Sequence, residues 1–415
     1  MSKDKLIPEL RFPEFENSKW NIKTVDDYCD VYRGSSFSKA DMIEDGSEHC
    51  IHYGELFTKY SEVITEILSR TNKHDGFRSE SGDVLMPSSD VTPDGLAKAS
   101  AITLDGVILG GDMNILRPKT EINSIFLSYL LNHSKREIIK LVSGTTVKHI
   151  YPSQIITCEI PVINNEIEQQ KIASCLSSLD ELLAAHNDKL DALKDHKKGL
   201  MQNLFPQDGE TVPKVRFPEF EGDGEWVEKK LGELGEFLGG GTPSRKNSEY
   251  WIGNIPWISS SDINEDDIHN VSISQYINEN AITESATKII PKGSVLFVSR
   301  VGVGKLAINN KELCTSQDFT SFIPTDVLNF FVAYYFAANS NLLKGLSQGT
   351  SIKGFSKSDL EDFKILYPSN PKEQQKIASC LSAVDELITA QADKIEQLQQ
   401  HKKGLMQGLF PKIND

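Results

Sequence analysis

Three short stretches of the 415-residue sequence carry residue types that could support catalysis. Residues 302–305 read GVGK, part of a phosphate-binding loop, but the GxxxxGK spacing and the hydroxyl residue after the lysine are missing. Residues 237–241 read FLGGG and fit a loose methyl-donor pattern, yet the chain has no NPPY or DPPY tetrapeptide to hold a flipped base. Asp362 and Lys364 supply one half of a nuclease motif whose other half has no equivalent. The sequence therefore predicts a chain that is not an enzyme.

The cysteines and histidines do not have the spacing of a metal site. The nine histidines do not cluster, and no CxxC pair occurs among the six cysteines. We expect reduced, buried thiols and no metal or other cofactor. The cysteines are Cys29, Cys50, Cys158, Cys175, Cys314 and Cys380.

The most prominent feature of the chain is a long stretch that occurs twice. Residues 168–206 and 373–411 agree at about two-thirds of their positions, so they are copies of one unit. Apolar residues recur in both at alternating steps of four and three, the heptad pattern of a helix that packs along one seam. The predicted interface residues on this seam are Ile172, Leu176, Leu179, Leu183, Leu190 and Leu193 in the first copy, and Ile377, Leu381, Val384, Ile388, Ile395 and Leu398 in the second.

Both ends of each predicted helix are marked in the sequence. Asn165 and Asn370 each stand three residues before a glutamate, as helix caps do, and Pro206 and Pro411 end the helices. Two seam positions per copy are polar, His186 and Lys197 in the first and the equivalent Gln391 and Lys402 in the second. Helices of about 40 residues are roughly three times longer than average, which favours two seams that face each other as a coiled coil. Two amphipathic helices in separate cores are the alternative.

A second repeat precedes each globular segment. The sequence RFPEFE occurs at residues 11–16 and 216–221 and is followed in each case by a tryptophan, Trp20 or Trp226. The chain is thus two modules, each an RFPEF segment, a globular segment and a long helix, with a short polar joint at residues 207–210. We expect one domain at residues 1–164, a helix at 165–206, a second domain at 207–369 and a second helix at 370–415.

The two globular segments share short anchors and little else. GDVL at residues 82–85 matches GSVL at 293–296, residues 51–56 match 258–263, and GTTVK at 144–148 matches GTSIK at 349–353. Strands are predicted at 101–109, 294–299 and 306–309, and helices at 124–141 and 328–346. The fold class is therefore α+β, with two mixed α/β domains. The two helices stayed alike while the two domains diverged. The helices must therefore contact the same partner or each other, and the two domains must bind different targets.

Charge and hydropathy limit the partners and the cellular location expected for this chain. The formal net charge of -15 argues against indiscriminate binding to polyanions, although a local basic surface is compatible with it. No apolar run approaches the length of a membrane span, and the N-terminal residues lack the apolar core of a signal peptide. We expect a cytoplasmic protein with no membrane partner.

In its paired EQQKIASCLS helices and RFPEF segments, the whole chain resembles the specificity subunit of a type I restriction-modification system. The resemblance implies two target recognition domains that each read one half of a bipartite double-stranded DNA site. It implies that the two long helices pack as an antiparallel coiled coil, and head-to-tail packing of equivalent helices gives a pseudo-two-fold axis. It also implies that two DNA adenine methyltransferase subunits dock on the helices, and restriction and translocase subunits bind through them.

Helix length fits this arrangement. About 40 helical residues span roughly 60 Å, and B-DNA repeats about every 34 to 36 Å. Two long helices could therefore hold two reading domains on one duplex, about one turn apart, with a fixed number of unread base pairs between the half-sites.

Candidate DNA contacts are the cations, amides and hydroxyl groups on loops of the two domains. The first domain offers Tyr53, Ser88, Ser89, Lys98, Thr145, Thr146, Lys148 and His149. The second offers Thr242, Ser244, Arg245, Lys246, Ser260, Arg300, Lys305, Gln348, Thr350 and Lys353. Any one of them could be an ordinary solvated loop residue, so the prediction concerns the sets. A protein-binding coiled-coil adaptor without DNA recognition is the alternative function, and the acidic net charge mildly favours it.

Overall fold

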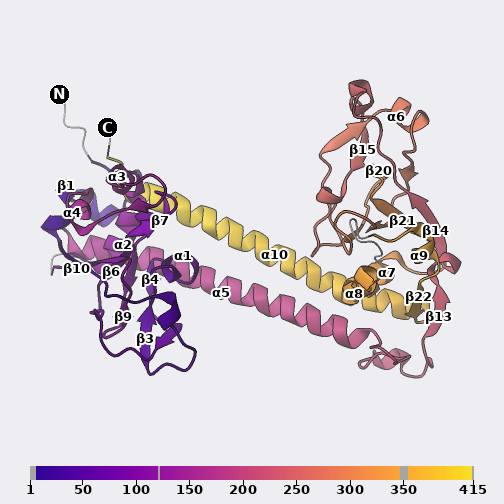
Figure 1. The fold of residues 1–415 in the computed structure, drawn as a ribbon, viewed down its shortest axis with the longest axis horizontal. Helices are drawn as coiled ribbons and strands as arrows, with labels where there is room; N and C mark the ends of the chain where they lie inside the picture. The colour runs from indigo at the N-terminus through magenta and orange to yellow at the C-terminus, as the bar shows by residue number, and fades with distance from the viewer. Residues whose placement is uncertain (1–5, 120–121, 346–353, 414–415) are drawn as a thin grey trace. The chain divides into compact units, whose positions relative to one another are not determined.

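The computed structural model describes residues 6–119, 122–345 and 354–413. The chain divides into two compact units, Met1–Asp188 with Ala392–Asp415 (unit 1) and Lys189–Gln391 (unit 2). Both predicted long helices are present, α5 (Glu166–Leu204) and α10 (Pro371–Leu409), as Figure 1 shows. The division falls inside both helices. Each unit therefore contains one globular region and about half of each helix.

The two helices start at the predicted asparagine caps, but α10 ends at Leu409 and not at the predicted bound of residue 415. The side-chain oxygen of Asn165 accepts hydrogen bonds from the N–H groups of Ile167 and Glu168 at 3.1 and 3.2 Å, and that of Asn370 accepts one from Lys372 at 3.0 Å. Each helix ends two residues before its proline. These caps satisfy N–H groups that have no partner within the helix.

Unit 1 is built from short strands and helices around its two long-helix segments. They are β1 (Trp20–Thr24), β2 (Cys29–Arg33), β3 (Glu48–Ile51), α1 (Glu55–Thr58), β4 (Val63–Ile64), β5 (Ser69–Thr71), β6 (Val84–Pro87), β7 (Ser89–Asp90), β8 (Ser100–Ile102), β9 (Ile108–Leu109), β10 (Met113–Pro118), α2 (Ser124–His133), α3 (Lys135–Lys140), β11 (Lys148–His149), α4 (Pro152–Ile155) and β12 (Glu159–Ile163). The larger sheet has the order β2-β10-β6-β8-β4 and the smaller one β5-β3-β9. A separate antiparallel pair, β1 with β12, joins the start of the globular region to its end.

Unit 2 has a similar plan, but its two sheets have four strands each where those of unit 1 have five and three. Its elements are β13 (Val227–Lys230), β14 (Gly235–Gly239), β15 (Ile255–Ile258), β16 (Gln275–Ile277), α6 (Glu279–Thr283), β17 (Ile289–Ile290), β18 (Val295–Val298), β19 (Leu306–Ile308), β20 (Leu313–Thr315), β21 (Phe319–Pro324), α7 (Asn329–Ala338), α8 (Ser340–Gly345), α9 (Lys357–Glu361) and β22 (Lys364–Tyr367). The sheets have the orders β14-β21-β18-β19 and β16-β15-β20-β17, and β13 pairs with β22. The anchors predicted from sequence fall at equivalent places, because GDVL leads into β6 and GSVL into β18, and β3 and β15 both pair in parallel with a later strand.

The long-helix segments run antiparallel within each unit. In unit 1, Ile172 near the start of α5 shares the hydrophobic core with Phe410, which directly follows α10. In unit 2, Phe205, which directly follows α5, shares the core with Ile377 near the start of α10. All predicted seam residues are buried or half-buried. The predicted antiparallel packing is thereby confirmed within each unit.

Each core combines residues from both sequence repeats. Phe410 of the second repeat packs edge-on against Trp20 of the first, with ring centroids 6.2 Å apart. Phe205 of the first repeat packs edge-on against Trp226 of the second, at 6.4 Å. The tryptophan that follows each RFPEF segment is therefore a core residue that receives the end of the other repeat's helix.

The arginine of each RFPEF segment holds the start of a long helix. Arg11 makes a two-point ion pair with Glu168, at 3.0 and 3.1 Å, and Arg216 makes the same pair with Glu373, at 2.8 Å for both bonds. Both glutamate side chains are 1% exposed. We name these two ion pairs the arginine clamps. They connect the two repeated sequence motifs to each other, a link that the sequence did not predict.

Three details of the sequence prediction were wrong. Residues 101–109 are not one strand but β8 and β9, which belong to different sheets and are separated by a turn in which Gly106 has a φ of 78°. The helix at 124–141 is broken at Ser134, and the helix at 328–346 is broken at Asn339, because both residues leave helical backbone angles. Four cysteines are buried as expected, but Cys175 and Cys380 are half-buried on the flanks of the long helices.

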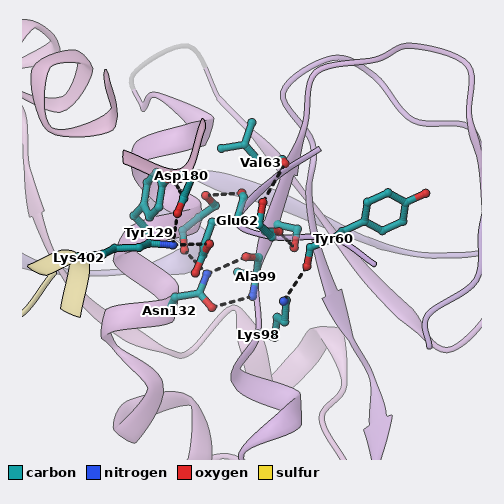
Figure 2. A network of polar contacts seen from close by, with 12 residues as sticks. Tyr60, Glu62, Val63, Lys98, Ala99, Tyr129, Asn132, Asp180 and Lys402 are labelled. Atoms are coloured by element: carbon teal, nitrogen blue, oxygen red, sulfur yellow. Dashed lines mark hydrogen bonds and ion pairs between the residues drawn. The ribbon is translucent and has the colours of Figure 1, made fainter. Parts of the chain in front are cut away.

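A polar contact ties the helix segments of unit 1 to the globular region (Figure 2). The Lys402 amino group in α10 lies 2.5 Å from Asp180 of α5 and 2.8 Å from Glu62. Tyr129 of α2 donates its hydroxyl hydrogen to Asp180 at 2.5 Å. Burial raises the pKa of Asp180 and of Tyr129. We call Glu62, Tyr129, Asp180 and Lys402 the unit 1 node.

Unit 2 contains an equivalent contact, the unit 2 node. Lys197 of α5 lies 2.6 Å from Asp385 of α10, and Tyr334 of α7 donates to the same carboxylate at 2.6 Å. The fourth member is His269, whose Nε2 is 3.1 Å from Asp385. Burial would raise the pKa of Asp385, but the hydrogen bonds from His269, Lys197 and Tyr334 together lower it. The lysine on each apolar seam thus pairs with an aspartate of the other repeat, which fixes the register of the two segments.

Candidate nucleic-acid interface

In unit 2, the loops that carry most of the predicted DNA contacts leave the sheet at the same edge. Strand β14 ends at Gly239, β18 ends at Val298 and β21 begins at Phe319. Gly239 lies opposite Thr320, and Val298 lies opposite Phe319. Because these three strand ends are neighbours, the loop 240–247 and the loop 299–305 emerge side by side. The structure therefore brings together residues that the sequence places about 55 positions apart.

Most of the candidates in these two loops are solvent-exposed. Thr242, Ser244, Arg245, Lys246 and Arg300 are all exposed. They present cations and hydroxyl groups of the kind that contact phosphates and base edges.

Lys305 and Ser260 differ from these residues because they belong to a loop contact inside unit 2. Lys305 is half-buried, and its amino group donates to the carbonyl oxygen of Ile263 at 3.1 Å. Ser260 is also half-buried and opens the short turn Ser260–Asp262 just before Ile263. Lys305 therefore holds two candidate loops together and has less freedom to contact a ligand.

Two arginines stand out from the others in the chain. Arg245 and Arg300 are the arginines for which no hydrogen bond or ion pair to a described residue is found. The remaining arginines bind protein groups, as Arg117 does with Asp83 at 2.8 Å. Arg245 and Arg300 both lie in loops at the same edge of the unit 2 sheet. Unused guanidinium donors at one edge are suited to an anionic or hydrogen-bonding partner.

Unit 1 assembles its candidates at the equivalent edge. Strand β2 ends at Arg33, β6 ends at Pro87 and β10 begins at Met113, and pairing places these strand ends together. The next strand, β7, pairs with β11, so that Ser89 lies opposite His149. Pairing of β7 with β11 thus brings the candidates at residues 88–89 to those at residues 145–149, which lie far apart in the sequence.

The unit 1 candidates differ in their exposure. Thr145 and Thr146 are exposed. Lys148 is half-buried and donates to the carbonyl oxygen of Gly144 at 2.8 Å, and His149 is half-buried and stacks on Tyr151. Ser88 and Ser89 are only 2% and 9% exposed. These serines are therefore buried, whereas the threonines lie at the surface.

Lys98 and Tyr53 have partners inside unit 1. The Lys98 amino group donates to the carbonyl oxygen of Tyr60 at 2.7 Å, as Figure 2 shows, and burial lowers its pKa. The ring of Tyr53 is half-buried and packs edge-on against Phe57 at 6.4 Å. Both side chains are thus engaged inside unit 1 and have less freedom to contact a ligand.

Three candidates, Gln348, Thr350 and Lys353, lie outside the described residues, as does the anchor GTSIK to which two of them belong. The described chain resumes at Gly354, and the N–H group of Phe355 donates to the carbonyl oxygen of Ser299 at 3.0 Å. This part of the chain therefore meets unit 2 beside the loop of Arg300.

Exposed apolar residues in the same loops were not predicted from the sequence. Val91 is 74% exposed, Val147 is 45% exposed and Val301 is 62% exposed. Each lies next to predicted polar candidates. Small apolar side chains are what contacts the thymine methyl group in a major groove. A β-branched residue within an otherwise polar loop is the sequence signal that could have identified them.

Neither a metal site nor a membrane span is found in the part of the chain that the structure describes. No group of three or more His, Cys, Asp or Glu side chains there could hold a metal ion. None of the helices among those residues is both long enough and apolar enough to cross a membrane.

Comparison with known proteins agrees with these observations. The family model described as "Type I restriction modification DNA specificity domain" matches residues 17–195 and again residues 223–400. The MjaIX type I restriction enzyme specificity subunit of Methanocaldococcus jannaschii is 38% identical over 190 residues, which are 45% of this chain and 44% of that protein. The match thus spans less than half the length of this relative. A putative MjaX specificity subunit of the same organism is 29% identical over 307 residues, 72% of this chain and 70% of that protein.

The fold is also similar to a solved structure. The S subunit of a type I restriction-modification system from M. genitalium superposes with a TM-score of 0.65 at 17% identity, covering 98% of this chain and 100% of that one. At this identity the likeness concerns the fold. The family assignment comes from the two matches of the family model, which together cover most of the chain. This chain therefore belongs to the family of type I restriction-modification DNA specificity domains, as its repeated helices and RFPEF segments indicate.

Proposed function

We propose that this chain is the DNA-recognition and scaffold subunit of a type I restriction-modification complex and performs no catalysis itself. The observation that carries the proposal is the presence of two specificity domains in one chain, with similar sheet plans but different loops at the equivalent sheet edge. Two domains with different loops suit an asymmetric, bipartite double-stranded DNA site. The domain at residues 1–164 reads one half of this site, and the domain at residues 207–369 reads the other.

In this proposal the long helices set the spacing between the two half-sites. Helices α5 and α10 each run for 39 residues without interruption. An uninterrupted helix of this length is about 60 Å long and stiff. The number of unread base pairs between the half-sites should accordingly be fixed.

Methylation mapping tests the proposed function. In a cell that expresses this chain with its methyltransferase partner, methylated adenines should fall in one two-part motif with a constant gap. The physical reason is that two different sheet edges contact two different half-sites. Sequencing that detects methylated bases is the measurement, and a strain without this chain is the control. If methylation occurs without a two-part motif, or does not depend on this chain, the proposal is wrong and an adaptor role is favoured.

The partner subunits are also part of the proposal. Two DNA adenine methyltransferase subunits dock on the long helices, and restriction and translocase subunits join through them, in the cytoplasm where chromosomal DNA is accessible. Support comes from exposed helix residues that are identical in both repeats. Five of them, in the first half of each helix, form a group that we call the duplicated stripe: Gln170, Ser174, Glu181, Leu182 and Ala185, with their equivalents Gln375, Ser379, Glu386, Leu387 and Ala390.

The exposed leucines are the apolar part of this stripe. Leu182 is 44% exposed and Leu387 is 55% exposed. An exposed leucine kept at the same position in both repeats suits two copies of one partner, because each copy would cover one of them. Some other exposed positions of the helices, such as Ala184 and its equivalent Thr389, differ between the repeats.

Leu182→Asp together with Leu387→Asp should therefore weaken methyltransferase binding by tenfold or more, because a charge would be buried in each contact. Either single change should leave one methyltransferase subunit bound per chain. Native mass spectrometry of the assembled complex measures both results. Ala184→Asp together with Thr389→Asp is the matched control, with the same added charge beside the stripe. Unchanged stoichiometry and affinity in the double leucine variant would rule out the stripe as the docking surface.

A further inference from the structure

The guanidinium group of Arg245 lies flat against a tryptophan in unit 2. The Cζ atom of Arg245 is 3.6 Å from the centre of the Trp251 ring and 5.2 Å from that of Trp257. Arg245 is exposed to solvent, yet this contact fixes the plane of its side chain. The neighbouring cation Lys246 has no such contact with an aromatic ring of a described residue.

The loop that carries Arg245 is held at two points by the same pair of tryptophans. Trp251 donates its indole N–H to the carbonyl oxygen of Ser244 at 3.3 Å, and Trp257 donates to that of Gly241 at 3.0 Å. Trp257 is 2% exposed, and the two rings pack edge-on with centroids 5.0 Å apart. Buried Trp257 therefore supports Trp251, and Trp251 supports both the backbone and the side chain of the loop.

Gly241 allows this close packing. A Cβ atom added at Gly241 would lie 2.5 Å from backbone atoms of Ala286 and Thr287, so a larger residue would push the loop away. In the glycine run at residues 239–241, which resembles part of a methyl-donor pattern in sequence, Gly240 and Gly241 bring the loop against its neighbours.

The donors of Arg245 remain available to a ligand. No hydrogen bond or ion pair joins its guanidinium group to a described residue. Beside it is a cleft of about 490 Å³ that Trp251, Ser274 and Tyr276 also line. A fixed, planar fork of N–H donors at the mouth of a cleft suits a partner with two acceptors in one plane.

Guanine and phosphate are the two groups of a DNA duplex that offer paired acceptors to an arginine. A phosphate is bound equally well by the unsupported Lys246 or by the exposed hydroxyl groups nearby, and it needs no fixed plane. The O6 and N7 atoms of guanine require a guanidinium group in the plane of the base, and an arginine on guanine is the commonest specific contact in the major groove. The stacked geometry thus favours the base over the backbone.

We propose that Arg245 reads a guanine in the half-site of the second domain and that Trp251 is the positioning residue that holds Arg245 in plane. This inference rests on the proposed function, because it requires that unit 2 contacts DNA. It adds a specific base and a specific residue to that function.

The test uses the full chain assembled with its methyltransferase partner. Arg245→Lys keeps the positive charge but loses the planar fork, so the complex should lose its preference for guanine at one position, by about 5- to 150-fold. All other positions of the motif should be unchanged. Methylation mapping and binding to duplexes with each single base-pair substitution measure this preference. Lys246→Ala is the matched control and should weaken binding to all duplexes alike.

Variants of Trp251 test its positioning role. Trp251→Phe keeps an aromatic face and should retain the guanine preference, whereas Trp251→Ala should reduce it although Arg245 is still present. Thermal unfolding checks that each variant is folded.

Each outcome separates this inference from the proposed function. If the unaltered complex has no two-part motif, the proposed function and the inference both fail. If the motif exists and Arg245→Lys leaves it unchanged, only the inference fails. Arg245→Ala could instead weaken binding to all duplexes equally, make the affinity less dependent on salt, and leave the motif unchanged. That result would show that Arg245 contacts a phosphate, and it would overturn the inference as well.

Discussion

Exchanging residues 20–160 for the equivalent segment of another family member is expected to replace one half of the target sequence completely and to leave the other half unchanged. The segment is structurally separable because β1 pairs with β12, so that its two ends lie side by side, with Trp20 opposite Ile163 and Thr24 opposite Glu159. It contains every described unit 1 loop that carries a candidate DNA contact. The long helices and the second domain keep their own sequence.

Mapping of methylated adenines before and after the exchange measures this result. The reciprocal exchange of residues 226–365 is the matched control and should alter only the other half-site. The gap between the halves should stay constant in both experiments, because the helices are unchanged. A change in both halves after one exchange would contradict the assignment of one domain to each half.

The second large effect is expected from the lysines of the two nodes. Lys402→Met should lower the free energy of unfolding by about 3 to 5 kcal/mol, because it leaves the carboxylates of Asp180 and Glu62 largely buried without their cation. The side chains of these two residues are 15% and 21% exposed. Lys197→Met should cost less, because His269 still donates to Asp385 in the unit 2 node. Denaturant unfolding measures both changes.

The next residue in each helix provides a matched control. Lys198 and Lys403 are exposed and follow the node lysines in both repeats, so their replacement by Met should change stability by less than about 0.5 kcal/mol. Equal, small effects of Lys402→Met and Lys403→Met would mean that the nodes do not hold the helix segments together.

The helical frame was largely predictable from the sequence because its signals are local. The heptad spacing, the asparagine caps and the terminal prolines each act within a few residues, and all three were confirmed. The partners of the seam lysines were not predictable, since Lys402 pairs with Asp180, which lies 222 positions away and off the apolar seam. The arginine clamps escaped prediction for the same reason: their partners are 157 residues apart.

The candidate interface was predicted as loops and not as contacts. Residue type identified candidate loops, and strand pairing then placed several of them at one edge, which no local signal could show. Burial divided the candidates, because a serine such as Ser88 and a threonine such as Thr145 look alike in sequence but differ in exposure. Trp251, which supports Arg245, lies six positions further along the chain and is itself held by the buried Trp257, so the sequence alone suggested the arginine and not its orientation.

The arginine clamps have a consequence for how much variety the inserted domains can have. Each clamp closes a loop of the chain whose two ends are 157 residues apart, and the whole recognition domain lies inside that loop. The entropic cost of closing a flexible loop grows only with the logarithm of its length, so doubling the enclosed segment adds about 0.6 kcal/mol. Insertions and deletions within a recognition domain would therefore cost the long helices and the arginine clamps little stability. Natural variation can change the length of the enclosed segment while both clamps are retained.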